Sequence, residues 1–476
     1  MYSFFEGNVS GIIFKKYLAY LPNLLHNTPM KHLRKLVLYE YRPLTLMLAL
    51  DVGLLVLAFI VDEPGAVLSG FLRIINSRSV LVTDYIALGG LGAALLNVSL
   101  VGLTSVLMLF RLDVKPSGPH IMALWLSVGF AFFGKNVFNM IPLTFGVWLY
   151  SRYANEDFRK SCLAALLVAT LSPVISEIAF LGINHRIIEI ALGVLLGFFV
   201  GFIFPAISLE TMRVHFGFHL YNMGFSGGLI ATILATLFKN MGIDIQPAAI
   251  WSSGNNVFLS SLLYAISAVM IGMGFLSHGQ MVNPENPDEH IKETVMTTLK
   301  NFREIYNHSG RLVTDFYAMA GKSVYINMGL LCAGATTVVL ILGADLNGPA
   351  MAGILTMMGF GALGKHVRNV APVMAGAIIS AYVNRWDPTA PNNMIPILFS
   401  SGLAPLAGAF GPIWGIIAGF LHVNVANYIG DLNGGMNLYN NGFAGCFVVL
   451  FLLPLITVFK RDSFFDKYYR KGKNVA

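Results

Sequence analysis

Apolar stretches, each about as long as a membrane-spanning helix, follow one another along most of this chain of 476 residues. Hydrophobic residues make up 56% of the chain and charged residues 12%, about half the charged share of ordinary water-soluble domains. With a mean hydropathy of +0.68, the chain has too little polar surface to cover a water-soluble fold of its size. We therefore expect an all-α polytopic membrane protein with about 14 membrane segments.

The net charge of +7 has the distribution of membrane-flanking loops rather than of a nucleic-acid-binding surface. Lys and Arg gather near both ends of the chain, as they do on the cytoplasmic flanks of spans. We expect a cell-membrane protein with both termini in the cytoplasm and no nucleic-acid partner. The expected parts are a cytoplasmic interfacial segment (1–43), a first membrane half (44–277), a polar connector (278–311), a second membrane half (312–459) and a basic cytoplasmic tail (460–476).

An internal duplication constrains the arrangement of these segments. LVTDY at 81–85 recurs as LVTDF at 312–316, and the pattern GKxxxNxxPxxxG occurs at 134–146 and again at 364–376. The offset is about 230 residues, and the repeat core of the first half runs over 78–238. Because one period holds about seven segments, an odd number, we expect the second copy to be inverted in the membrane.

The two copies of this pattern predict broken or re-entrant helices. The stretches 119–153 and 349–383 are each too long for one span and too short for two. We expect them to break at Gly134–Lys135 and at Gly364–Lys365, where a following proline frees backbone carbonyls. Such irregular backbone is tolerated within a membrane only where protein buries it or water reaches it.

A second duplicated motif, HLYNxGFxG at 219–227 and NLYNxGFxG at 437–445, would let a helix begin within the membrane and direct polar groups at a solute. The candidate solute-binding residues of both motifs are Asn139, Asn369, Tyr221, Asn222, Tyr439, Asn440, His219, Asn437, Lys135, Lys365, Phe130 and Phe360. No metal-ligand spacing and no catalytic motif is present in the sequence. We expect no cofactor and no enzymatic activity.

Each candidate has a structural alternative. The motif asparagines could cap helices while their neighbouring glycines pack, the two lysines could extend to the membrane interface, and the aromatic rings could serve packing alone. For Asp84 and Asp315 of the LVTD motif we expect helix caps rather than pairing with the lysines. Asp51 stands alone in its apolar segment, and the duplication assigns it no partner.

Two resemblances follow from these motifs. FNMIPLTFG at 138–146 resembles the asparagine-proline helix start of urea transporters, and LYNxGF at 220–225 and 438–443 resembles their tyrosine-asparagine motif. That family implies inverted halves, re-entrant pore helices and usually a trimer. Over nearly its full length the chain also resembles a duplicated bacterial membrane family catalogued as domain of unknown function 1576, which implies no activity.

The sequence therefore predicts a transporter or channel for a small polar solute, urea-like, with the solute path between two inverted repeats. The alternative within transport is an ion-coupled carrier of a small anion that uses Lys135 and Lys365 for charge. From another class, a membrane scaffold or an enzyme acting on a lipid stays open. The expected partners are the solute, the lipid bilayer and further copies of the chain in a dimer or trimer.

Overall fold

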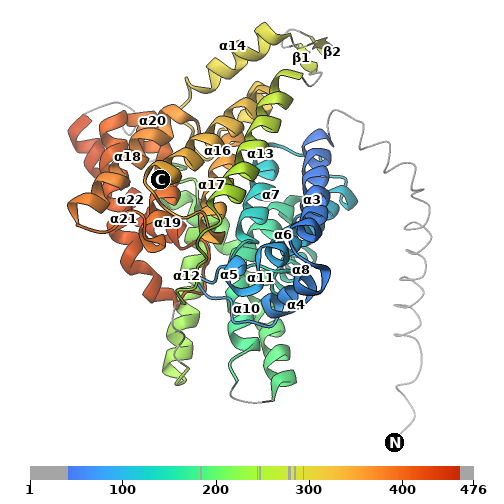
Figure 1. Ribbon diagram of the computed structural model, residues 1–476. Coiled ribbons are helices and arrows are strands. Elements are labelled where there is room, and N and C mark those ends of the chain that lie inside the picture. The colour runs from blue at the N-terminus through green and yellow to red at the C-terminus, as the bar shows by residue number, and fades with distance from the viewer. Residues whose placement is uncertain are drawn as a thin grey trace, which may run out of the picture.

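A computed structural model describes residues 41–182, 185–243, 245, 248–276, 280–283, 286–292 and 294–460 (Figure 1). Most of the expected N-terminal segment and nearly all of the expected tail lie outside these residues. The described part of the chain is helical, apart from a short antiparallel hairpin of β1 (Gln280–Asn283) and β2 (Asn286–Lys292) in the connector. In Figure 1 this hairpin lies beside α14 at one end of the helix bundle.

Helices α3 to α12 form the first half of the fold. They are α3 (Arg42–Val61), α4 (Pro64–Ile75), α5 (Tyr85–Gly89), α6 (Leu91–Arg111), α7 (Gly118–Phe130), α8 (Val137–Tyr153), α9 (Phe158–Leu167), the 3₁₀ turn η2 (Val168–Leu171), α10 (Ser172–Ala179), α11 (Arg186–Val214) and α12 (Asn222–Asn240).

The remaining helices repeat this order. They are α13 (Asn256–Leu276), α14 (Val295–Ile305), α15 (Phe316–Ala320), α16 (Ser323–Ile341), α17 (Gly348–Gly359), η3 (Phe360–Ala362), α18 (Val367–Val383), α19 (Pro391–Phe399), η4 (Ser400–Leu403), α20 (Ala404–Phe410), α21 (Pro412–Ile429), η5 (Gly430–Asn433) and α22 (Asn440–Lys460).

Packing assigns α13 to the second set of helices. Helix α3 packs along α6, and α13 packs in the same way along α16, while α8 with α11 matches α18 with α21. From the sequence, the segment 256–276 was expected in the first membrane half (44–277), ahead of the polar connector. Its helix contacts show that it corresponds to α3 instead.

Nine of the described helices are long and apolar enough to cross a membrane, fewer than the expected 14 segments. The difference arises largely at the broken stretches, where α7 has 13 residues and α17 has 12. A helix of that length extends about 18–20 Å and falls short of the roughly 30 Å hydrocarbon layer. The chain is thus a polytopic helical protein in which half-length helices occupy the centre.

Helices α7 and α17 pack against each other in opposite directions. Gly118 at the start of α7 donates its backbone N–H to both Asp315 carboxylate oxygens at 3.1 Å. A methyl group at that glycine would lie 2.4 Å from the Ala362 carbonyl oxygen, just beyond the end of α17. Asp315 also accepts the Ala318 N–H, and Asp84 accepts that of Ile86, so the expectation that both aspartates cap helices is confirmed.

Candidate functional site

The first helix break is held by a closed set of hydrogen bonds. Beyond α7 the backbone turns at Gly134, whose φ of 73° is accessible to glycine, and α8 begins at Val137. Asn136 and Asn139 exchange backbone and side-chain bonds at 2.8 and 3.0 Å. The Asn139 amide nitrogen donates to the Gly134 carbonyl at 3.0 Å and to Ser176 Oγ at 2.9 Å. Asn139 therefore stabilises the break and leaves no amide proton for a solute.

The second break repeats this geometry. Gly364 has a φ of 93°, and the Asn369 amide nitrogen donates to its carbonyl at 2.9 Å and to the Ser309 carbonyl at 3.3 Å. The Asn369 side-chain oxygen accepts the His366 N–H at 3.0 Å. Both breaks lie where the sequence predicted them. At each break the asparagine side chain donates to the carbonyl of the preceding glycine.

Helices α7 and α8 form a hairpin with the first break at its tip. Both pack against α9, which follows α8 after a short loop. Cys162, in the first turns of α9, lies with its Sγ 3.4 Å from Nε2 of His120, in the first turn of α7. The start of α9 therefore lies beside the start of α7. Because α8 ends just before α9, α7 and α8 together leave the molecule's interior at the end where α7 began.

Each tyrosine-asparagine motif docks into the break of the other half. The Leu220 N–H donates to the Gly402 carbonyl at 3.0 Å, and the Leu438 N–H donates to the Thr170 carbonyl at 2.9 Å. A methyl group at Gly134 would lie 2.2 Å from Leu438 Cδ2, and one at Gly364 would lie 3.0 Å from Leu220 Cδ2. The glycines thus make room for these leucines, and the two halves interlock.

A row of aromatic rings connects the two breaks. The ring centroids of Phe130 and Tyr439 lie 5.2 Å apart, those of Tyr439 and Tyr221 4.6 Å, and those of Tyr221 and Phe360 5.1 Å. Phe399 flanks the row at 6.0 Å from both Phe130 and Tyr221. All these rings are buried, so their packing closes the centre of the molecule.

Lys365 lies at one end of this row. Its Nζ donates to Ser401 Oγ at 2.8 Å and to the Tyr221 hydroxyl. The same nitrogen lies 4.4 Å from the Tyr221 ring centroid and 4.8 Å from that of Phe360. The side chain is fully buried, and within the described residues it forms no ion pair. Lys365 therefore does not extend to the membrane interface in this conformation.

Lys135 occupies the equivalent position with fewer partners. It is 1% exposed, and Asn97 donates to its carbonyl at 2.9 Å, as Asn327 does to that of Lys365 at 2.7 Å. Within the described part of the chain no hydrogen bond involves Lys135 Nζ, and the Tyr439 hydroxyl is also buried without one. Ala169 stands where the second half has Ser401. The two halves thus hold their lysines differently.

The motif asparagines point into their own halves. The Asn222 side-chain oxygen accepts from Thr211 Oγ1 at 3.0 Å and contacts His215 Nε2 at 2.9 Å, and its nitrogen donates to the Ser208 carbonyl at 2.9 Å. Asn440 accepts from Asn433 Nδ2 at 2.8 Å. Both asparagines are candidate solute-binding residues, and in this structure their hydrogen bonds lead to α11 with the residue after it and to η5.

His219 and Asn437 are the first residues of the two motifs, and the side chain of each contacts the opposite half. Asn437 donates to the Gly224 carbonyl at 3.0 Å. His219 is fully buried beside Tyr221, and neither ring nitrogen has a hydrogen-bond partner. A methyl group at Gly445 would lie 2.5 Å from His219 Nε2. His219 thus adds unpaired polar atoms close to the aromatic row.

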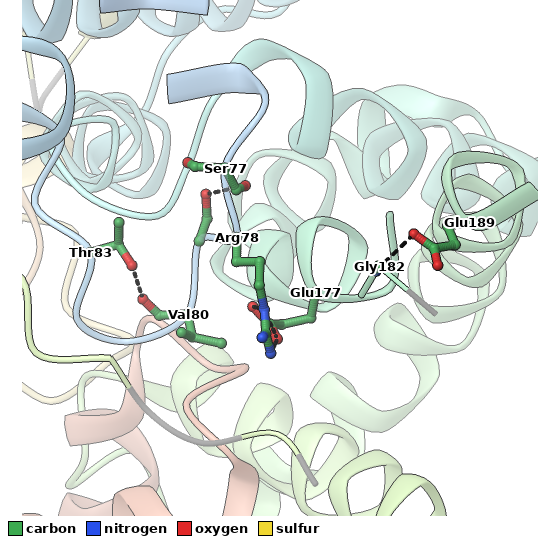
Figure 2. A network of polar contacts seen from close by, with 8 residues as sticks. Ser77, Arg78, Val80, Thr83, Glu177, Gly182 and Glu189 are labelled. Atoms are coloured by element: carbon green, nitrogen blue, oxygen red, sulfur yellow. Dashed lines mark hydrogen bonds and ion pairs between the residues drawn. The ribbon is translucent and has the colours of Figure 1, made fainter. Parts of the chain in front are cut away.

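An ion pair adjoins the first break (Figure 2). Arg78 Nε donates to both Glu177 carboxylate oxygens, at 3.1 and 3.0 Å. The Glu177 side chain is 0% exposed and that of Arg78 is 46% exposed. Glu177 follows Ser176, which binds the Asn139 amide. The partly exposed Arg78 guanidinium therefore binds the residue next to Ser176, and Ser176 in turn binds Asn139 of the first break.

Sequence reasoning missed Ser401 and Phe399 as part of this site. Both lie in FSSGLAP at 399–405, which aligns with LVATLSP at 167–173 through the shared proline. That alignment was available from the sequence and would have marked η2 and η4 as equivalent 3₁₀ turns. The approach of η4 to Lys365 is a tertiary contact with no local signal.

The fold and this site define a multi-pass helical membrane protein in which two copies of a helix-break motif interlock. The chain belongs to the family described as "Protein of unknown function (DUF1576)", whose model matches residues 63–240 and 294–458. No curated protein and no solved structure matches the chain. The resemblance to urea transporters therefore has no support from these comparisons.

Proposed function

We propose that this protein is a secondary carrier of a small anion, in which Lys365 and Lys135 contact the anion from the two halves. The observation that carries the proposal is the burial of one lysine at each of two equivalent helix breaks. Neither lysine forms an ion pair with a carboxylate among the described residues. Residues at such depth that can carry charge usually mark a substrate or ion pathway.

The chemistry around Lys365 suits an anion better than a neutral solute. A positive charge on the buried Lys365 without a counter-charge is costly, so burial favours the neutral amine, and a bound anion would stabilise the charged form. The Tyr221 and Ser401 hydroxyls that now accept from Lys365 could each rotate to donate to an anion.

The closed centre supports a carrier rather than an open channel. Phe130, Tyr439, Tyr221 and Phe360 fill the space between the breaks, so a solute can pass only if these rings move. The two halves also hold equivalent lysines differently. In an inverted repeat, a contact of Tyr439 with Lys135 in place of that of Tyr221 with Lys365 would open the site to the opposite side.

The neutral-solute channel, which the urea-transporter resemblance implies, has weaker support. In such a channel Asn222 and Asn440 would bind the solute, whereas the Asn222 amide bonds within the first half and the Asn440 side-chain oxygen accepts from Asn433. The carrier proposal requires no catalytic group.

The test is uptake of radiolabelled chloride, formate, phosphate and urea into liposomes that contain the purified protein. We expect saturable uptake of at least one anion, inhibition by excess of the same unlabelled anion, and no uptake of urea above that of empty liposomes. Lys239→Met, which removes an exposed lysine at the end of α12, serves as the control and should leave anion uptake unchanged. Uptake of urea alone, or of none of the four solutes, would exclude the proposal.

A further inference from the structure

Helix α3 buries a carboxyl group that the anion site does not use. Asp51, at the middle of α3, is 0% exposed. Both of its carboxylate oxygens lack a hydrogen-bond partner. Gly102 of α6 makes room for this group, because a methyl group there would lie 2.1 Å from Asp51 Oδ1. Ser99 Oγ donates to the Asp51 backbone carbonyl at 2.7 Å and holds α6 against α3 at this level.

Among the residues that the structure describes, no charged group pairs with this carboxylate. The titratable and charged residues on α3, on its ends and on the elements that pack against it are Tyr41, Arg42, Asp62, Glu63, Arg73, Arg111, His120 and Tyr264. The Tyr41 hydroxyl donates to Asp113, and Glu63 is exposed beyond the end of α3. Arg111 is nine residues beyond Gly102, about 14 Å along α6. Arg73 donates to the Leu88 and Gly89 carbonyls.

The other titratable residues around α3 also have partners of their own or lie far along the helix from Asp51. The Asp62 carboxylate accepts the Gly92 N–H at 2.7 Å, His120 contacts Ser117, and the Tyr264 hydroxyl contacts Thr337. Arg42 begins α3, nine residues before Asp51. An ionised Asp51 would therefore be an unpaired charge within the membrane, and burial without a partner favours the neutral, protonated carboxylic acid.

Helix α6 connects Asp51 to the first break. Asn97 lies five residues before Gly102 on α6 and donates to the carbonyls of Ala131 and Lys135, at 2.8 and 2.9 Å. Loss of the proton would require water to reach Asp51, and hence a separation of α3 from α6. That movement would displace Asn97, which holds the backbone of the first break at Lys135.

The second half has no such group. Helix α13, the counterpart of α3, contains no charged residue. The residue at the position of Gly102 is Cys332, whose Sγ contacts the Leu263 carbonyl at 3.7 Å. One carrier molecule therefore contains one buried carboxyl group of this kind within its described residues.

We infer that Asp51 is the binding site of a proton that is carried together with the anion. The inference rests on the proposed function. The proton comes from water on one side of the membrane and returns to water on the other, so one proton and one monovalent anion cross without net charge. Sodium fits this site poorly because glycine, which offers no side-chain oxygen, borders the carboxylate.

The test compares two modes of transport in liposomes with Asp51→Asn, using radiolabelled chloride, formate and phosphate as probes. Exchange of internal for external anion at equal pH needs no net proton movement and should stay within about twofold of wild type. Accumulation driven by an inward proton gradient should fall at least about tenfold. Asp345→Asn, a change in the loop between α16 and α17, should leave both modes at wild-type rates.

The outcomes separate this inference from the proposed function. If the wild-type protein transports no anion, both proposals are refuted. If Asp51→Asn accumulates the anion from a proton gradient as fast as the wild-type protein does, the proton site alone is refuted. The same holds if a sodium gradient, and not a proton gradient, accelerates transport. An infrared spectrum of wild type at neutral pH covers the case in which the variant does not fold. The C=O band of a protonated carboxylic acid should be present, and its absence would overturn the inference.

Discussion

Replacement of Lys365 by methionine should separate transport from stability. The change removes two hydrogen bonds, from Nζ to Ser401 and to Tyr221, and two contacts with aromatic rings. Hydrogen bonds to a charged group contribute about 1.5–3 kcal/mol each, and cation–π contacts about 1–2 kcal/mol. The change also removes the cost of burying an ammonium group, which is several kcal/mol. Methionine is of similar length and apolar, so we expect the free energy of unfolding to change by less than about 2 kcal/mol.

Transport should respond much more strongly. If Lys365 contacts the anion, its loss removes one charge-assisted interaction, about 1.5–3 kcal/mol. That range corresponds to a decrease of about 10- to 150-fold in anion flux. The measurements are exchange flux of radiolabelled anion in liposomes and thermal unfolding of the purified variant in detergent.

A matched control replaces a residue beside Lys365 with the residue type found at the equivalent position of the other half. Ser401→Ala removes one hydroxyl partner of Lys365 and installs the residue that Ala169 already provides at the equivalent position. We expect it to lower flux less than Lys365→Met does. Normal flux through a stably folded Lys365→Met protein would refute the assignment of the anion contact, and loss of folding would show that the lysine is a structural group.

Two further predictions concern topology and the tyrosine-asparagine motif. Cysteines introduced near Tyr153 and near Trp386 should be labelled from opposite sides of the membrane, because these regions, at the ends of α8 and α18, are equivalent in the two copies; labelling from one side would exclude inversion. Asn222→Leu should destabilise the protein by about 2 kcal/mol or more, since Thr211, His215 and Ser208 lose a partner. Asn440→Leu should cost less because its amide oxygen accepts a hydrogen bond from Asn433 alone among the described residues, and equal thermal stability of both variants and wild type would contradict this account.

The sequence by itself determined the membrane environment, the positions of the helix breaks and several helix boundaries. The stretch 119–153 was expected to break at Gly134–Lys135, and α8 begins just after that point, at Val137, and ends at Tyr153. Gly134 and Gly364 were expected to end the preceding helices, and both have the positive φ that follows from their lack of a side chain. These features depend on neighbouring residues, so the local pattern specifies them.

Only the tertiary structure decided which groups meet at the site. Lys365 contacts Tyr221 from 144 positions away and Ser401 from 36 positions away. The motifs are duplicated, and the sequence of one copy does not specify whether it docks into its own half or into the other. That choice is made by long-range packing, in which Leu220 fits beside Gly364 and Leu438 beside Gly134. For the same reason, the orientation of Asn222 depended on the helix that packs beside it rather than on its motif.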